Sequence, residues 1–304
     1  MPGMEHRLED FLRAPVAAAF FVLAQRNDLS ADDLADPATA CTAASTALRE
    51  LNPWSGTAPA ARTAAVDAAQ CLRPLVRSVL ADERNAWWQA PLRREAQLLL
   101  TGHEDQQPAP EAVPVPTGAI AAWETYAQKP LRSLITSSEL SVPPGEPIRS
   151  SAHAELACGA GDWHPHYPVG QQRLHVGEGA RVAEVHCAAD WHELVARYGD
   201  PSTHPGSDDS LERSADLDNG PAPTWSAVAE DFDGVHLSFA GLLSALYVPH
   251  TGTGTGTRAG IGTTTSWAWD WERTHWIRPV VTATTELPEL PESPQAASYW
   301  LSLQ

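Results

Sequence analysis

The chain has 304 residues, a formal net charge of −18 at pH 7 and four cysteines. This length allows one large domain or two ordinary ones, each with its own buried core. The negative charge repels phosphate backbones and anionic lipid, so we expect no nucleic-acid partner and no membrane-surface partner.

The cysteines are far apart and form no CxxC pair, which is typical of reduced thiols rather than of disulfides or a thiolate zinc site. The most apolar stretch near the start, residues 14–24, is about half the ~20 residues that a membrane span needs. Acidic residues precede this stretch, where a secretory signal would be basic. We therefore expect a cytoplasmic protein.

The first hundred residues have helical periodicity, with apolar side chains recurring every three or four positions. Pro15 is expected to kink or divide the first helix. Ser30 followed by Asp33 resembles a capped helix start. Further helical runs are expected over 60–82 and from Pro91 onward, so residues 1–103 predict a compact bundle of about four helices.

Residues 104–117 form a proline-spaced stretch without periodicity, which is typical of a semi-rigid connector. The charge distribution changes at the same place. Residues 1–103 carry ten basic and twelve acidic residues, whereas residues 104–304 carry ten basic and twenty-six acidic residues. We therefore predict two domains, a helical bundle at 1–103 and a second domain at 118–304.

The second domain shows short strand patterns separated by turn-rich insertions. Strands are expected at about 131–137, 171–176, 180–187, 234–239 and 265–278, with short helices near 189–198 and 224–231. The acidic, serine-rich insertion from Gly199 to Pro223 and the Thr/Gly run from Thr251 to Thr257 predict surface loops. The fold class is therefore α+β, a helical bundle followed by a mixed, strand-rich domain.

Lys129 is the only lysine in the chain, against nineteen arginines. A retained ammonium group can serve chemistry that a guanidinium cannot, although a single leftover lysine needs no function. An apolar strand pattern follows it and ends in three consecutive hydroxyl residues, Thr136, Ser137 and Ser138. This segment is the first place where we expect chemistry.

Seven of the twelve histidines lie between residues 153 and 204. In an extended segment, His164 and His166 would project to one side, as a metal site requires. Hydrogen-bonded or surface histidine is the alternative, and the chain has no HExxH-type helix pair. We expect no metal, and a metal-dependent enzyme built on these histidines is the third reading of the function.

The segment from Ser266 to Ile277 alternates tryptophans with polar residues. In a strand, Trp269 shares one face with the neighbouring tryptophans, and Asp270 and Glu272 share the other. The tryptophan face is suited to core packing or to stacking on a ligand. The carboxylate face favours a functional role for Glu272. If Glu272 is instead buried and paired, Arg132 or Arg278 would be its partner.

The segment DFDGVHLS, residues 231–238, reads as a helix end, a turn and a strand that contains His236. Together with the segment from Lys129 to Ser138 and the closing WDWERTHW, it resembles a group of uncharacterised actinobacterial and phage proteins. The order of motifs over about 120–278 is also similar to the ADP-ribosyltransferase fold, in which an S-T-S strand and a late strand glutamate surround NAD. Here the hydroxyls are permuted, and Asp270 stands two residues before Glu272.

The resemblance implies an NAD-using ADP-ribosyltransferase or an NAD glycohydrolase, with NAD as substrate. Glu272 would stabilise an oxocarbenium-like ribose, Ser137 would orient that carboxylate, and Lys129 would meet a phosphate. The same resemblance implies that the nucleotide lies against Thr136, Ser138, His236, Trp269 and Asp270. The alternative is a non-catalytic protein with a degenerate nucleotide pocket, which would bind a protein partner through its helical domain.

Overall fold

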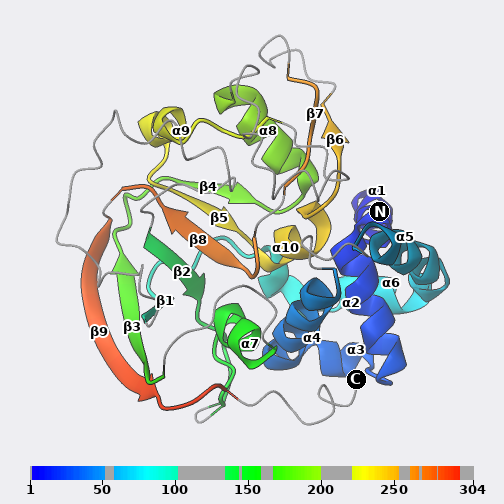
Figure 1. The fold of residues 1–304 in the computed structure, drawn as a ribbon, viewed down its shortest axis with the longest axis horizontal. Helices are drawn as coiled ribbons and strands as arrows, with labels where there is room; N and C mark the ends of the chain where they lie inside the picture. The colour runs from blue at the N-terminus through cyan, green and yellow to red at the C-terminus, as the bar shows by residue number, and fades with distance from the viewer. Residues whose placement is uncertain are drawn as a thin grey trace.

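The computed structural model describes residues 2–51, 58–101, 134–143, 146–158, 167–199, 221–252, 261–266, 269–278 and 280–294. It confirms the α+β class: a mixed seven-stranded sheet lies beside a group of helices from the start of the chain (Figure 1). Lys129, the connector at 104–117 and the domain limits at 103 and 118 lie outside the described residues.

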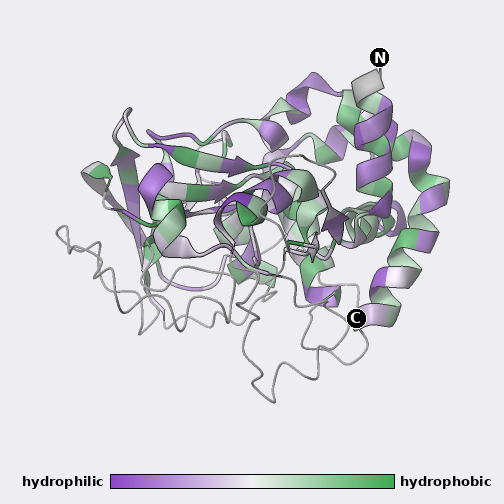
Figure 2. Ribbon diagram, turned by 90° about the horizontal axis from the view of Figure 1, so that it is seen from above, coloured by the Kyte–Doolittle hydropathy of each residue, from purple (hydrophilic) through white to green (hydrophobic). Residues whose placement is uncertain are grey.

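The helical part contains a series of short elements that pack on one another. In chain order they are α1 (Pro2–Arg13), α2 (Pro15–Arg26), α3 (Ala31–Leu34), α4 (Pro37–Glu50), α5 (Ala58–Ala69), the 3-10 helix η1 (Gln70–Leu72), α6 (Arg73–Ala81) and the 3-10 helix η2 (Glu83–Gln89). Figure 2 shows hydrophilic residues alternating with hydrophobic ones along these helices.

The predicted helix boundaries at Pro15 and Ser30 are confirmed. Pro15 begins α2, so the first helical run is divided there. Ser30 and Asp33 form a reciprocal capping box at α3, which satisfies backbone donors that the helix itself leaves unpaired. Asp36 then caps α4 by accepting a hydrogen bond from the Thr39 backbone N–H.

The helix predicted from Pro91 onward is wrong, because residues Gln97–Thr101 form strand β1. This strand lies between β2 and β3, near the middle of the sheet. Its leucines, Leu98, Leu99 and Leu100, are all buried. A short apolar run that is buried on both faces has no period that separates strand from helix, which explains the error.

The sheet has the order β4-β5-β8-β2-β1-β3-β9, in which only β4 and β5 pair in parallel. Its other strands are β2 (Leu134–Ser138), β3 (Val169–Val176), β4 (Val182–Val185), β5 (Gly234–Leu237), β8 (Arg273–Trp276) and β9 (Val281–Leu290). β6 (His250–Thr251) and β7 (Thr263–Thr264) form a separate pair. A parallel pair needs a crossover, which here contains α8 (Ala188–Tyr198) and α9 (Trp225–Asp231).

The strand expected at 265–278 is shorter than predicted, since β8 begins only at Arg273. Trp269 to Glu272 precede the strand, so the predicted alternation of tryptophans and carboxylates on two strand faces is wrong for them. Trp267 lies outside the described residues. Helices α7 (Ser151–Cys158) and α10 (Phe239–Ala245), together with β9, were not anticipated.

A single apolar core runs from the helical part into the sheet. It joins side chains of α1, α2 and α4 to those of β5, α8 and α10. Trp88 lies at this junction, with ring centroids 6.2 Å from Phe11, 5.8 Å from Phe20 and 5.1 Å from Phe239. A helical bundle that folds on its own therefore stays a prediction.

The four cysteines are free, as expected. None of the helices in the described ranges has both the length and the apolarity that a membrane crossing requires.

Trp88→Ala should lower the free energy of unfolding by about 3–5 kcal/mol, because it leaves a large cavity where helices and sheet share their core. Denaturant unfolding measures this change. The matched variant is Trp87→Ala, since the Trp87 ring is only partly buried. A Trp88 variant no less stable than the Trp87 variant would contradict the shared core.

Candidate functional site

A cavity of about 510 Å³ lies where the helical part meets one end of the sheet. This volume is within the range of small-molecule sites in proteins. The helical side contributes Ala35, Pro37, Cys41, Arg84, Trp87, Ala90, Pro91 and Arg93, and the sheet side contributes Ser138, Glu139, Leu140, Ser141, Ser151, His236, Ser238, Phe239 and Glu272. Both parts of the fold are thus needed to form it.

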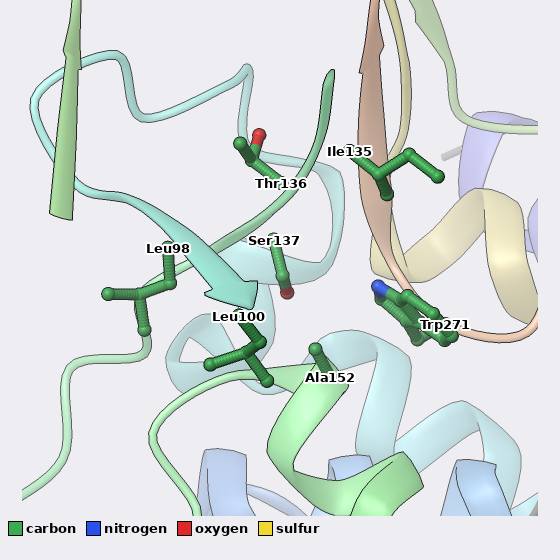
Figure 3. Close-up of a pocket in the computed structure, with 7 residues that line it drawn as sticks. All are labelled: Leu98, Leu100, Ile135, Thr136, Ser137, Ala152 and Trp271. Atoms are coloured by element: carbon green, nitrogen blue, oxygen red, sulfur yellow. The ribbon is translucent and has the colours of Figure 1, made fainter. Parts of the chain in front are cut away.

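A second cavity, of about 10 Å³, lies beside Ser137 and Trp271. Figure 3 shows it between β1, β2 and α7, with the Ser137 side chain directed toward Ala152. Its volume is about that of one water molecule, so only the larger cavity can accept an organic ligand.

Glu272 lies at the wall of the larger cavity, and its side chain is only 7% exposed. One carboxylate oxygen, Oε2, accepts hydrogen bonds from the Ser137 hydroxyl at 2.9 Å and from the Ser138 backbone N–H at 3.1 Å. The Ser151 hydroxyl lies 3.2 Å from the same oxygen. Burial of a carboxylate is costly unless it is hydrogen-bonded and paired, and here both conditions hold.

The hydroxyl residues reach Glu272 from two elements. Ser137 and Ser138 end β2, which pairs with β8 directly after Glu272. Ser151 begins α7 and donates its hydroxyl proton to the Glu272 backbone carbonyl at 2.8 Å. The Ser137 and Ser151 hydroxyls are 3.0 Å apart. Together these contacts fix both the side chain and the backbone of Glu272.

His236 joins Glu272 to a second carboxylate, Glu184. The His236 Nε2 atom is 3.0 Å from Glu272 Oε1, and Nδ1 is 2.5 Å from Glu184 Oε2. Glu184 and His236 are directly paired residues of the parallel strands β4 and β5, so both side chains lie on one face of the sheet. Glu184 Oε1 also accepts a hydrogen bond from the Leu92 backbone N–H at 3.1 Å.

This arrangement keeps His236 protonated. Burial alone would lower the pKa of His236, but the hydrogen bonds and charges of Glu184 and Glu272 outweigh it and raise the pKa to about 9. Burial likewise acts to raise the pKa of Glu184, and the hydrogen bond and charge of His236 reverse that effect and lower it. With both carboxylates ionised, the three groups carry a net charge of −1.

The wall of the cavity offers aromatic rings and guanidinium groups. The Trp87 and Phe239 rings are 4.7 Å apart and both line the cavity. Arg84 is ion-paired with Asp82 and Asp32, and Arg93 donates to the Glu139 backbone carbonyl. The lining of the cavity thus combines two aromatic rings and two guanidinium groups with the Glu272 carboxylate.

Cys41 also lines the cavity, from α4. Burial, and then the nearby charge of Glu272, raise the pKa of its thiol well above the usual range. Because the thiolate is the nucleophilic form, this shift of the pKa disfavours Cys41 as a nucleophile.

The structure brings together Glu272, Ser137, Ser138 and His236 of the predicted site residues. Arg278 was one of two predicted ion-pair partners of Glu272. That prediction is wrong, because Arg278 is instead paired with Asp233 at 3.7 Å. Arg132 lies outside the described residues. The partner of the buried Glu272 is His236.

Three predicted residues lie elsewhere. Thr136 donates to the Gln97 side chain at 2.6 Å and accepts from the Trp276 indole at 2.9 Å. Trp269 is buried against Trp191 and His275, and Asp270 lies 3.3 Å from Arg273. None of the three lines the larger cavity.

Several residues of the site were missed by the sequence analysis. Glu184 is the one charged residue within β4, and its position directly opposite His236 depends on parallel pairing that the sequence does not reveal. Trp87 belongs to a Trp-Trp pair that the helical periodicity did not explain. Ser151 comes from α7, which was not anticipated.

The described histidines do not form a metal site. In the described ranges, no group of three or more His, Cys, Asp or Glu side chains is arranged to hold a metal ion. His153 contacts Ser150 and Gln171, and burial lowers its pKa to about 4. His164 and His166, the proposed ligands, lie outside the described residues.

Comparison of the chain with protein-family models, curated proteins and solved structures found no match. The likeness to the ADP-ribosyltransferase fold therefore stays a prediction from the motifs, and the function has to be argued from the site itself.

The free energy of unfolding should fall as the pH rises from about 6.5 to about 9. The folded-state pKa of His236, about 9, lies above its ordinary value of 6.5, so its contribution is complete below pH 6.5 and is lost as pH rises through 9. Denaturant unfolding over this range measures the slope. In Glu184→Gln the slope should be smaller, and equal slopes in both proteins would contradict the assignment.

Proposed function

We propose that the larger cavity binds a nucleotide and that Glu272 promotes cleavage of its glycosidic bond, as in an NAD glycohydrolase or an ADP-ribosyltransferase. The observation that carries this proposal is the Glu272 carboxylate, held in place by His236, Ser137 and Ser138 at the wall of a cavity large enough for an organic ligand. The resemblance of the motifs supports the same reaction class.

The chemistry requires a fixed negative charge. Cleavage of the bond between ribose and nicotinamide passes through an oxocarbenium-like ribose, whose positive charge a nearby carboxylate stabilises. Glu272 is hydrogen-bonded on both oxygens, so it needs little rearrangement when that charge develops. The net charge of −1 on Glu184, His236 and Glu272 favours the cationic transition state.

The cavity wall suits the rest of a nucleotide. Trp87 and Phe239 offer rings on which a base can stack. Arg84 and Arg93 supply guanidinium groups of the kind that bind phosphate. Lys129 remains a further proposed phosphate contact, outside the described residues. NAD carries both a base and phosphates, which makes it the substrate that we propose.

NAD or ADP-ribose at millimolar concentration should raise the melting temperature. A ligand that binds only the folded protein at a hundredfold excess over its Kd stabilises by ~2.7 kcal/mol. Trp87→Ala should reduce the shift, because it removes a stacking surface of the cavity. Cys71→Ala is a matched control on the exposed surface. An unchanged melting temperature and no heat in calorimetry would remove the nucleotide from the proposal.

Glu272→Gln should lower the rate of nicotinamide release by about a hundredfold or more while NAD still binds, because the amide keeps the shape and loses the charge. The matched control is Asp270→Asn, two residues away. Asp270 also pairs with a buried cation, Arg273, but lies outside the cavity.

Both substitutions should reduce stability, and only Glu272→Gln should reduce turnover. A Glu272→Gln enzyme with wild-type turnover would rule out Glu272 as a catalytic residue. Equal losses of turnover in the two variants would instead assign the effect to stability alone.

A binding protein without catalysis is the second candidate function. It is favoured by the hydrogen bonds that the protein already makes to both oxygens of Glu272. In that case NAD or ADP-ribose would stabilise the wild-type protein, and no nicotinamide would be released over hours. The same two measurements therefore separate the candidates.

A further inference from the structure

Glu184, His236 and Glu272 form a row of charged side chains, which extends beyond the residues that the proposed reaction uses. Glu184 does not line the cavity, yet it forms a short contact with His236, which in turn contacts Glu272. Side-chain exposure is 25% at Glu184, 3% at His236 and 7% at Glu272. His236 thus connects the more exposed carboxylate, Glu184, to Glu272 at the wall of the cavity.

Glu184 determines which form of His236 is stable. An imidazole that has a carboxylate oxygen at each ring nitrogen donates from both nitrogens only when it is protonated. Without the carboxylate at Nδ1, burial is opposed by Glu272 alone, so the neutral ring, which still donates from Nε2, becomes more favourable. The contact between His236 and Glu272 would then change from an ion pair to a hydrogen bond that a neutral ring donates to the carboxylate.

Two features support a built arrangement rather than a chance contact. Glu184 and His236 are directly paired residues on neighbouring strands, so the backbone fixes their separation. The second oxygen of Glu184 is held by the Leu92 backbone N–H. Pro91, directly before Leu92, lines the cavity, so this anchor ties Glu184 to the cavity wall.

We propose that Glu184 and His236 are positioning residues, in which Glu184 orients His236 and stabilises its charged form, and His236 holds the Glu272 carboxylate in place through an ion pair. This inference rests on the proposed function of Glu272. In this role neither residue transfers a proton, because His236 acts by holding the Glu272 carboxylate in position.

The titratable and polar groups that face Glu184, His236 and Glu272 come from several elements. Glu184 and the nearby His186 belong to β4 and the turn after it, and Glu272 precedes β8. From α4, the Cys41 thiol feels the charge of Glu272. The Ser137 and Ser138 contacts from β2 do not titrate. A pH response of His236 is therefore governed by its two carboxylates.

The test is Glu184→Gln, with His236 followed by NMR and nicotinamide release measured from pH 6 to 9.5. In the wild-type protein the His236 ring should titrate near pH 9. In Glu184→Gln the midpoint should fall by at least one pH unit. Turnover of the variant relative to wild type should be nearly unchanged at pH 6 and about eightfold lower at pH 9.5, since a one-unit fall of the midpoint cuts the protonated fraction of His236 there from about one quarter to about 3%.

Two further variants separate positioning from folding. Glu184→Asp keeps the charge and should restore most of the wild-type pH profile. Glu286→Gln, a Glu-to-Gln change on the exposed strand β9, should leave both the His236 midpoint and turnover unchanged. A loss of turnover in Glu184→Gln that is equal at every pH would assign Glu184 a purely structural role and overturn the inference.

The remaining outcomes distinguish the inference from the function on which it rests. An unshifted His236 midpoint in Glu184→Gln, with wild-type turnover present, overturns the inference and leaves the proposed function standing. A shifted midpoint with no turnover by the wild-type protein supports the coupling of Glu184 to His236. That result overturns the proposed function. It also overturns the proposal that the coupling between Glu184 and His236 serves catalysis.

Discussion

The requirement to place one buried and one half-buried carboxylate beside a buried imidazolium governs this end of the fold. Removing charged groups from water costs several kcal/mol per ion unless close pairing and hydrogen bonds offset the loss. Glu184 and Glu272 share His236, and backbone N–H groups of Leu92 and Ser138 meet the remaining negative charge. Satisfying these groups requires β4, β5, the start of β8 and the end of β2 to meet at one place, which the order of the sheet provides.

The helical part completes this site rather than standing apart from it. The sheet supplies the anion, whereas Trp87, Arg84 and Arg93 come from η2 and the segment after it. Trp88, the neighbour of Trp87, lies in the apolar core that the helices share with α10. One side chain of this pair therefore anchors the helices, while the other faces the cavity. A ligand that contacts the helical side and the sheet side of the cavity would bind where the shared apolar core already holds the two parts together.

Local sequence signals predicted the elements that local physics controls. The helix division at Pro15 and the cap at Ser30 depend on residues a few positions apart, and both are present. The pairing of Glu184 with His236 depends on parallel strands separated by some fifty residues, for which the chain carries no local signal. The prediction for β1 failed because its three leucines are all buried, which leaves no alternation to distinguish a strand from a helix.

Glu272 shows how far a motif can be taken. Its position in a tryptophan-rich segment suggested a functional carboxylate on the polar face of a strand. In the structure Glu272 does not belong to a strand. Glu272 precedes β8 and is almost wholly buried. A solvent-facing role is thereby excluded, and burial with His236 is compatible with catalysis, since preorganised electrostatic stabilisation requires a charge that is fixed before the reaction begins. Stability and turnover would then depend on the same contacts, and measurements that follow charge, such as a pH profile or the titration of His236, separate the two roles directly.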